Sequence, residues 1–346
     1  MPSPPVPTAL ITGFLGSGKT TLLNGLLQHT GMADTAVIVN EFGEIGLDHL
    51  LIETAFEDAV LLKSGCICCT VRGDLVDTIE TLDQRRRSGA IPAYRRIAIE
   101  TTGLADPAPI MTLLMEEVRL RDLVTLDRVI ATVDAANALS TLDAHYESAK
   151  QVALADRLVL TKTDLVTAEM RRDVEARLRR LNPEAPIIVA VAGHIAPGVL
   201  FDADLTPGSR HDRLAAAEGL GGHAHHHGDA ADAVGHLAQA HGISSFTLWR
   251  DQPIEWENLR AWLEALASLK GPDLLRMKGI VNIAGRAGPV VLHGVQHVFH
   301  PPQELARWPD ADRRSRIVFI TRNIPQIAVA GSFAAAMAGR GASNRS

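Results

Sequence analysis

The segment from Gly13 to Thr20 constrains the fold of this chain more than any other. It reads Gly-Phe-Leu-Gly-Ser-Gly-Lys-Thr, which fits the pattern G-x-x-x-x-G-K-[ST]. A strand-like run, Thr8–Thr12, precedes it and a helix-like run, Lys19–Gln28, follows it, which is the context that the pattern needs. Glycines let successive backbone N–H groups turn toward an anion, and the helix N-terminus adds its positive dipole end. The segment therefore predicts a phosphate-binding loop; the alternative is a chance glycine-rich turn.

The residues of this loop have separate predicted roles toward a bound nucleotide. Lys19 is expected to bridge β- and γ-phosphate oxygens and to act in hydrolysis, and the Thr20 hydroxyl is expected to ligate Mg²⁺. The other nucleotide-binding residues predicted in and beside the loop are Gly13, Gly16, Ser17, Gly18 and Thr21.

Short apolar strands alternate with helical stretches up to about residue 205. After the first strand and helix, the strand-like runs are Ala36–Asn40, Ala59–Leu62, Arg96–Ile99, Arg128–Val133, Arg157–Leu160 and Ile187–Val191, and the helical runs include Gly73–Arg87, Ala108–Arg119 and Ala168–Leu181. Near-continuous apolar strands between amphipathic helices indicate a mostly parallel sheet that is covered on both faces. We therefore expect an α/β domain over residues 6–206.

The composition changes after this domain. Residues 207–242 are rich in Gly, Ala, Asp and His and contain few large apolar side chains, which predicts a flexible linker. Residues 243–330 predict a smaller α+β domain, with a hairpin turn at Gly285–Gly288. Residues 331–346 are expected to form a frayed tail. The expected elements of the second domain are the strands Ile243–Trp249, Gly279–Ala284, Pro289–Phe299 and Arg316–Thr321 and the helix Glu255–Leu269.

A second motif indicates which base the nucleotide carries. Thr161-Lys162-Thr163-Asp164 ends the strand-like run Arg157–Leu160. The Asp164 carboxylate can accept hydrogen bonds from N1–H and the exocyclic amine of guanine, whereas the bare N1 acceptor of adenine would repel it. The stem of Lys162 can lie along the purine, and Thr161 stands where many GTPases carry Asn. The motif predicts a guanine site and disfavours a P-loop kinase; a solvated turn is the alternative.

A third motif follows the strand-like run Arg96–Ile99. Glu100 ends that run beside the expected phosphate loop, where its carboxylate can reach the hydration shell of Mg²⁺ and act in hydrolysis. Gly103 suits a loop whose amide approaches the γ-phosphate. Most P-loop proteins carry Asp where this chain has Glu100. Because no Gln or His is obviously placed to orient the attacking water, basal hydrolysis is expected to be slow.

All three cysteines of the chain lie within four positions, at Cys66, Cys68 and Cys69. This interval lies between the phosphate loop and Glu100, where GTPases carry segments that respond to the γ-phosphate. Thiolates suit Zn²⁺, Cu(I) and other late transition metals rather than Mg²⁺ or Ca²⁺. A fourth ligand could be a carboxylate, a His or water. The alternatives are buried apolar cysteines and a redox pair, although Cys68 and Cys69 are adjacent and cannot readily close a relaxed disulfide.

Composition and charge exclude several other classes of protein. With 34 basic and 40 acidic residues the formal charge is −6, which argues against a nucleic-acid partner. No apolar stretch approaches the roughly 18 residues that span a bilayer, so no membrane partner is expected. The N-terminus lacks the basic lead and the cleavage site of a signal peptide, and a cytoplasmic location is expected.

The motifs taken together resemble the CobW-like family of GTP-dependent metallochaperones. The resemblance extends from Leu10 to about Ile320 and rests on GFLGSGKTT, NEFGE, GCICC, ETTG, TKTD and the late RMKGIVNIAG, VLHGVQHVF and RIVFI. This family includes zinc chaperones, cobalt chaperones for cobalamin synthesis and nitrile hydratase activators. The resemblance implies a P-loop GTPase domain joined to a CobW-type C-terminal domain. It also implies that GTP and Mg²⁺ organise metal binding at Cys-x-Cys-Cys, and that hydrolysis releases the metal to a client metalloprotein.

The resemblance also implies auxiliary metal ligands. Glu44 matches a position at which a carboxylate helps to hold zinc in some relatives, whereas Val39 stands where another relative has Glu; a solvated carboxylate is the alternative for Glu44. The histidine-rich segment resembles that of several family members and is expected to capture or buffer metal, although a merely polar linker is the alternative. Its clustered histidines are His223, His225, His226 and His227.

The resulting prediction is a cytoplasmic GTPase that uses GTP and Mg²⁺ to deliver Zn²⁺, or alternatively Co²⁺, to a client metalloprotein. Within the family, the alternative is a cobalt chaperone for cobalamin synthesis or an activator of a cobalt or iron enzyme such as nitrile hydratase. From another class, the alternative is a regulatory GTPase switch with a structural zinc. The oligomeric state is open, with a homodimer as one option.

Overall fold

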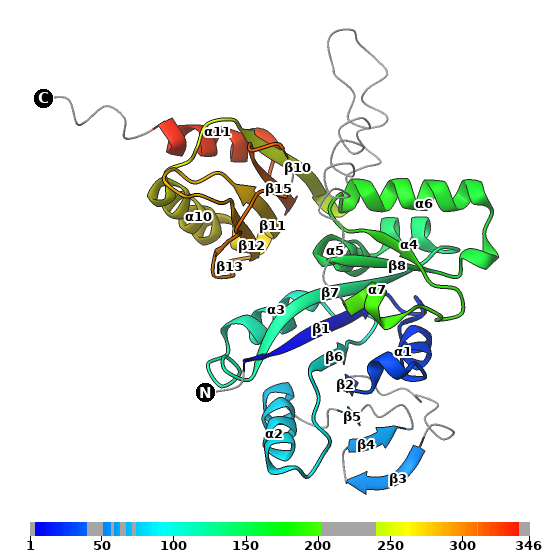
Figure 1. The fold of residues 1–346 in the computed structure, drawn as a ribbon. Coiled ribbons are helices and arrows are strands. Elements are labelled where there is room, and N and C mark those ends of the chain that lie inside the picture. Colours follow the sequence, from blue (N-terminus) through cyan, green and yellow to red (C-terminus); the bar gives the residue numbers. More distant parts are fainter. Residues whose placement is uncertain are drawn as a thin grey trace, which may run out of the picture. The chain divides into compact units, whose positions relative to one another are not determined.

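The computed structural model of the chain describes residues 4–39, 51–56, 59–62, 67–70, 74–201, 240–309 and 311–338. These residues belong to two compact units, and Figure 1 labels most of their helices and strands. The first unit comprises Met1–Arg177 and Ala185–Leu205, and the second comprises Leu178–Glu184 and Thr206–Ser346. Each unit has its own sheet and its own hydrophobic core. In the described part of the chain, no helix is long and apolar enough to cross a membrane.

The first unit is built on a sheet that has nine strands among the described residues, in the order β3-β4-β5-β2-β6-β1-β7-β8-β9. Every neighbouring pair from β5 to β9 in this order is parallel, whereas β3 and β4 pair antiparallel at one edge. The strands are β1 Val6–Gly13, β2 Thr35–Val39, β3 Leu51–Phe56, β4 Ala59–Leu62, β5 Ile67–Thr70, β6 Arg96–Glu100, β7 Val124–Asp134, β8 Arg157–Thr161 and β9 Ile187–Val189.

Helices follow most of the parallel strands in the chain. Two of them begin at aspartate caps: Asp74 accepts a hydrogen bond from the Val76 N–H at 2.9 Å, and Asp106 accepts one from the Ala108 N–H at 3.0 Å. The helices are α1 Lys19–Leu27, α2 Leu75–Ser88, α3 Pro107–Glu116, α4 Ala138–Ala144, α5 Tyr146–Leu154, α6 Ala168–Leu181 and α7 Pro197–Phe201, with the short 3-10 helices η1 Thr30–Met32 and η2 Thr163–Leu165.

The central strands are buried on both faces, as a covered parallel sheet requires. Every residue of β2 and of β8 is buried. Four leucines of α1 pack into the cluster that also contains Ile11, Val37 and Ile130 of the sheet; they are Leu22, Leu23, Leu26 and Leu27. This packing fixes the first turn of α1, and with it the end of the loop that follows β1.

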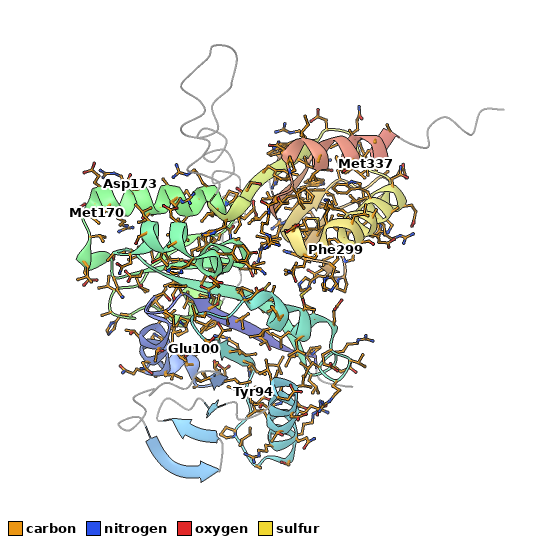
Figure 2. All side chains as sticks on the ribbon, turned by 180° about the vertical axis from the view of Figure 1, so that it is seen from behind. Tyr94, Glu100, Met170, Asp173, Phe299 and Met337 are labelled. Carbon is orange, nitrogen blue, oxygen red and sulfur yellow. The ribbon has the colours of Figure 1, made fainter. Side chains whose placement is uncertain are left out.

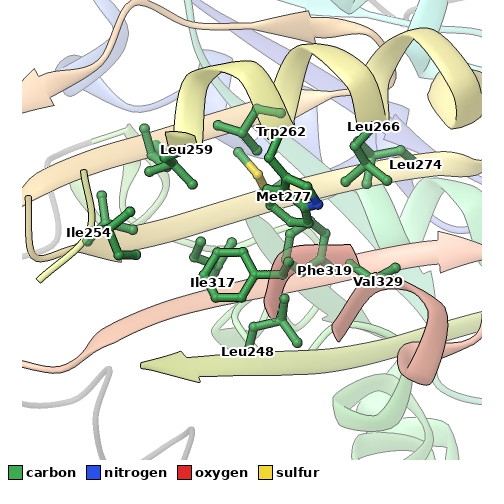
Figure 3. Packing of buried hydrophobic residues seen from close by; sticks show 14 of the residues in the cluster. Leu248, Ile254, Leu259, Trp262, Leu266, Leu274, Met277, Ile317, Phe319 and Val329 are labelled. Carbon is green, nitrogen blue, oxygen red and sulfur yellow. The ribbon is translucent and has the colours of Figure 1, made fainter. Parts of the chain in front are cut away.

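Among the described residues, the second unit has an antiparallel sheet and the helices α10 and α11. The strand order of the sheet is β10-β15-β11-β12-β13, and β14 also pairs with β12. Trp262 lies edge-on to Phe319, with ring centroids 6.0 Å apart, and to Phe333, with ring centroids 5.0 Å apart. Figure 3 shows Trp262 and Phe319 among the buried residues of this core. The elements are η3 Ala240–Gly242, β10 Ile243–Arg250, α10 Trp256–Lys270, η4 Gly271–Asp273, β11 Leu274–Val281, β12 Val290–Val295, β13 Val298–Phe299, β14 Gln303–Glu304, β15 Ser315–Arg322 and α11 Gln326–Ala338.

Two strand predictions in this unit differ from the structure. The strand expected at Gly279–Ala284 begins earlier, because β11 starts at Leu274. The strand expected at Pro289–Phe299 is divided into β12 and β13, because Gln296 adopts a positive φ of 53° and turns the chain between them. The hairpin expected at Gly285–Gly288 is present, since β11 and β12 pair antiparallel across it.

The structure differs from the frayed tail that the sequence predicts from residue 331. Helix α11 continues to Ala338, with Val329 and Phe333 buried on it. These two residues lie four positions apart and therefore share one face of the helix, which covers the core of the second unit. Of the predicted linker at residues 207–242, the described residues include only η3.

Candidate functional site

The loop after β1 has the backbone of a phosphate-binding loop. Gly13, Gly16 and Gly18 adopt positive φ values of 142°, 69° and 92°. At Gly13 an added Cβ would lie 2.2 Å from Oγ1 of Thr132, so no larger residue fits there. Gly18 is the residue before α1, and its left-handed backbone leads the chain into the helix.

The Lys19 side chain folds back over this loop. It is buried, and its Nζ donates to the carbonyl oxygens of Gly13 at 3.0 Å and Phe14 at 3.3 Å. The ammonium group therefore lies among the loop residues, where phosphate oxygens of a nucleotide would meet it.

Polar contacts connect the loop to the ends of two neighbouring strands. The hydroxyls of Ser17 and Thr132 are 2.6 Å apart, and Thr132 lies near the end of β7. At the end of β8, Thr161 donates from Oγ1 to the carbonyl oxygen of Ser17 at 2.8 Å. The structure therefore places the Ser17 and Thr161 hydroxyls in contacts that hold the loop, and their predicted part in nucleotide binding would be indirect.

Glu100 lies at the end of β6 beside α1 (Figure 2). It is 1% exposed, and its Oε1 accepts a hydrogen bond from Oγ1 of Thr20 at 3.1 Å. The two side chains thus bring oxygen atoms together beside the phosphate loop. Oxygen donors are what Mg²⁺ prefers, so this pair fits the magnesium site that the sequence predicts.

The loop after Glu100 rests on the phosphate loop. A Cβ added to Gly103 would lie 2.8 Å from the backbone nitrogen of Leu15 and 2.6 Å from its Cδ2. Only glycine allows the two backbones to approach so closely. Gly103 therefore lies against the phosphate loop, and its approach to the γ-phosphate stays a prediction.

Lys162 is held by a carboxylate that the sequence interpretation did not single out. Its Nζ donates to Oδ2 of Asp134 at 2.8 Å, and Asp134 also accepts from Asn137 Nδ2 at 2.9 Å and from the Ala136 N–H at 2.8 Å. Burial alone would raise the pKa of Asp134, but these hydrogen bonds outweigh it and hold the pKa below its usual 3.8. The available signal was the position of Asp134 at the end of a parallel strand.

Asp164 and Thr21 lie on the surface around this site. Asp164 is exposed in η2, the short helix after β8, so its carboxylate is accessible to the base of a nucleotide. Thr21 is exposed on α1, and a Cβ added to Gly193 would lie 2.3 Å from its carbonyl oxygen. The turn after β9 therefore packs on α1, a contact that the sequence did not predict.

A cavity of about 280 Å³ opens beside these residues. The phosphate loop, the end of β7 and helix α4 line it, together with Lys162. Phe14 of the loop also stacks on His145, with ring centroids 4.5 Å apart. Of the predicted nucleotide residues, Gly16, Ser17 and Lys162 line this cavity, which lies at the carboxyl edge of the sheet, where parallel sheets bind ligands.

The predicted metal ligands are described only in part. Cys68 and Cys69 belong to strand β5, in which they lie opposite Val37 and Ile38 of β2. Among the described residues no group of three or more His, Cys, Asp and Glu side chains could hold a metal. The other predicted ligands lie outside the described residues; they are Cys66, Glu44, His223, His225, His226 and His227.

The backbone register nevertheless relates the cysteine strand to Glu100. Strand β2 lies between β5 and β6, and Val39 pairs with Thr70 on one side and with Glu100 on the other. Cys69 precedes Thr70. Because neighbouring strands are about 4.8 Å apart, the end of β5 lies about 10 Å from the end of β6.

Profiles of two known families match the chain. The nucleotide-binding domain of the CobW/HypB/UreG family matches residues 7–189. The C-terminal domain of the cobalamin synthesis protein cobW matches residues 243–337.

Individual proteins also match over most of the chain. It is 33% identical over 330 residues to the zinc chaperone YjiA of Escherichia coli, which covers 95% of this chain and 98% of YjiA. It is 31% identical to the zinc chaperone CobW of Pseudomonas aeruginosa, over 96% of this chain and 92% of that protein. Among solved structures, Zn(II)-bound YjiA GTPase from E. coli matches with a TM-score of 0.74 and 30% identity, over 96% of this chain and 99% of that one.

Proposed function

The chain belongs to the CobW/HypB/UreG family, and on that premise we propose that it is a GTP-hydrolysing metallochaperone that carries Zn²⁺ to a client metalloprotein. The relatives named as zinc chaperones support zinc as the cargo. The observation that carries the proposal is the register of β5, β2 and β6, which brings the cysteine strand to the same sheet edge as Glu100. Hydrolysis of the γ-phosphate beside Glu100 can therefore alter the position of the cysteine strand through the intervening strand β2.

The nucleotide binds at the loop from Gly13 to Thr20. Lys19 meets the β- and γ-phosphates, and the backbone N–H groups of the loop surround them. Thr20 and Glu100 would hold Mg²⁺, which neutralises phosphate charge when it is bound. With these groups the chain orients the γ-phosphate for attack by water.

Guanine is selected by Asp164. Its exposed carboxylate accepts from N1–H and the exocyclic amine, a pattern that adenine lacks. Asp134 holds Lys162 beside it, so the stem of Lys162 has a fixed course along the nucleotide pocket. Thr161 acts on the phosphate loop through the Ser17 carbonyl oxygen.

The cargo ion is bound by the thiolates of Cys66, Cys68 and Cys69. Three soft ligands in one segment favour Zn²⁺ over Mg²⁺, which therefore does not compete for the cargo site. Glu44 is the proposed fourth ligand, and His223, His225, His226 and His227 are proposed to capture metal before transfer. Co²⁺ is the alternative cargo, because ligand type alone does not separate it from Zn²⁺.

The test is Zn²⁺ titration of the wild type and a Cys66→Ala, Cys68→Ala, Cys69→Ala triple variant, both saturated with a non-hydrolysable GTP analogue and Mg²⁺. We expect the triple variant to lose more than about 100-fold in Zn²⁺ affinity, because the thiolates supply most of the binding free energy. Affinity for the analogue, measured without zinc, should stay the same. Equal Zn²⁺ affinity of the two proteins would contradict the proposed cargo site.

A further inference from the structure

Helix α5 holds the loop that follows Glu100 through two neighbouring side chains. Nε2 of Gln151 donates to the carbonyl oxygen of Gly103 at 3.2 Å and to that of Ala105 at 3.0 Å. Nζ of Lys150 lies 2.5 Å from Oδ2 of Asp106, the residue that caps α3. Helix α5 therefore holds the loop between β6 and α3 at Gly103, Ala105 and Asp106.

Gln151 is 1% exposed, and the direction of its amide is determined by its partners. Both partners are carbonyl oxygens, which only accept hydrogen bonds, so the nitrogen must face them. Its Oε1 is buried without a hydrogen-bond partner among the described residues. Gln151 thus contributes two donated hydrogen bonds to the loop and, among those residues, accepts none with its side chain.

The peptide that Gln151 holds is the one in contact with the phosphate loop. A Cβ at Gly103 would lie 2.9 Å from Cα of Leu15 and 2.8 Å from its nitrogen, so the two backbones are in contact. If the donated hydrogen bonds were lost, the Gly103 carbonyl would have to seek water, and the loop could move away from Leu15.

We infer that Gln151 is a positioning residue for triphosphate recognition: it holds the Gly103 peptide against the phosphate loop, where the third phosphate of GTP ends. The inference rests on the proposed function, because it requires that this site bind GTP. GDP lacks the group that meets this loop. Gln151 should therefore affect GTP binding and hydrolysis, while GDP binding is left nearly unchanged.

Gln151→Met tests this inference most directly. Met has a similar length and removes both the donor and the unpartnered Oε1, so the fold should be retained. We measure the Kd of a non-hydrolysable GTP analogue and of GDP, each with Mg²⁺, together with kcat and KM for GTP. The Kd of the analogue should rise about tenfold, as expected for two lost hydrogen bonds, and that of GDP by less than about twofold.

Gln151→Glu is the second variant. At about pH 7.5 its carboxylate would face two carbonyl oxygens and repel them, so the analogue should bind more weakly than to Gln151→Met. Burial raises the pKa of such a carboxyl, and its protonated form can donate again. At about pH 5.5 the affinity for the analogue, relative to the wild type at the same pH, should therefore recover in Gln151→Glu and stay low in Gln151→Met.

Val152→Ala is the control on the same helix. Val152 is buried and adjacent to Gln151, so the substitution removes buried methyl groups and lowers the stability of the fold. It removes no hydrogen-bond donor to the loop between β6 and α3. Its ratio of GTP-analogue to GDP affinity should equal that of the wild type.

Two outcomes overturn the inference. One is an unchanged ratio of analogue to GDP affinity in both Gln151 variants, and the other is equal weakening of the analogue and GDP. If the wild type itself neither prefers the analogue nor hydrolyses GTP, the proposed function fails as well. If the wild type prefers the analogue to GDP and both Gln151 variants prefer it to the same extent, this inference alone is overturned.

Discussion

Asp134 and Lys162 connect the ends of β7 and β8 by a partly buried ion pair. Strands β7 and β8 are adjacent, and Asp134 pairs in the sheet register with Thr161, the residue before Lys162. Because the hydrogen bonds to Asp134 lower its pKa, the carboxylate stays ionised throughout the neutral range.

Asp134→Asn should destabilise the chain by about 1–2 kcal/mol at neutral pH, because a charge-assisted hydrogen bond to Lys162 is lost. The folded pKa of Asp134 lies below 3.8, so its stabilising effect is complete above pH 3.8 and is lost as the pH falls through the folded pKa. Urea unfolding of the wild type and the variant from neutral pH down to about pH 3 measures this difference. A difference that grows on acidification would contradict the assignment.

Gly103→Ala should lower kcat for GTP at least about tenfold, because the new Cβ would lie 2.8 Å from the Leu15 nitrogen and must displace the loop. Steady-state hydrolysis measures the effect. The matched control is Gly331→Ala, whose Cβ would meet nothing within 4 Å on helix α11. That variant should hydrolyse GTP at the wild-type rate, and equal losses in both variants would contradict the argument.

Residues were predictable from the sequence where the motif spacing defines them. Lys19, Thr20 and Glu100 lie as expected around the phosphate loop, although their roles stay predictions. Asp134 and Gln151 were not predicted, because each acts through a partner 28 or 48 positions away. Such pairs depend on which strands are neighbours, and one sequence does not reveal strand order.

At the scale of elements, strand β5 carries two of the proposed metal ligands, Cys68 and Cys69. The sequence interpretation placed the cysteines after the strand Ala59–Leu62 and assigned them no strand of their own. That strand is β4, and it pairs antiparallel with β5, which continues the parallel sheet beside β2. A strand of four residues in which cysteines alternate poorly with apolar side chains gives no clear period-two pattern.

Helix α11 was missed for a related reason. Its sequence, QIAVAGSFAAAMA, is made mostly of small residues, and those from residue 331 on were interpreted as a tail. The informative signal was the spacing of Val329 and Phe333, which places two larger apolar side chains on one helical face. A pair of residues is a weak pattern until the core that it covers is known.

Phe333→Ala should destabilise the second unit by about 3–5 kcal/mol, because the ring is 6% exposed and packs against Trp262. Thermal unfolding monitored by tryptophan fluorescence measures the loss. Ile327→Ala is the control on the same helix; its side chain is 81% exposed, so the change should stay within about 0.5 kcal/mol. Equal effects of the two variants would show that α11 does not pack as described.

At the scale of the whole molecule, the family and the fold class were both predictable. Membership of the CobW family is confirmed, as is an α/β unit with a mostly parallel sheet followed by a smaller α+β unit. The GTPase and zinc predictions are confirmed at the level of the relatives, which carry those names. The cysteine ligands and the cytoplasmic location stay predictions. The client and the homodimer also stay predictions, because no motif of this chain specifies a partner.

We propose that nucleotide binding and metal binding are coupled across the carboxyl edge of the sheet, where β5 and β6 both end. The most direct measurement is the Zn²⁺ affinity of the wild type, by chelator competition, with a non-hydrolysable GTP analogue and with GDP. We expect Zn²⁺ to bind at least about tenfold more tightly with the analogue, and Zn²⁺ must then tighten analogue binding relative to GDP by the same factor. Equal Zn²⁺ affinity in the two nucleotide states would contradict it.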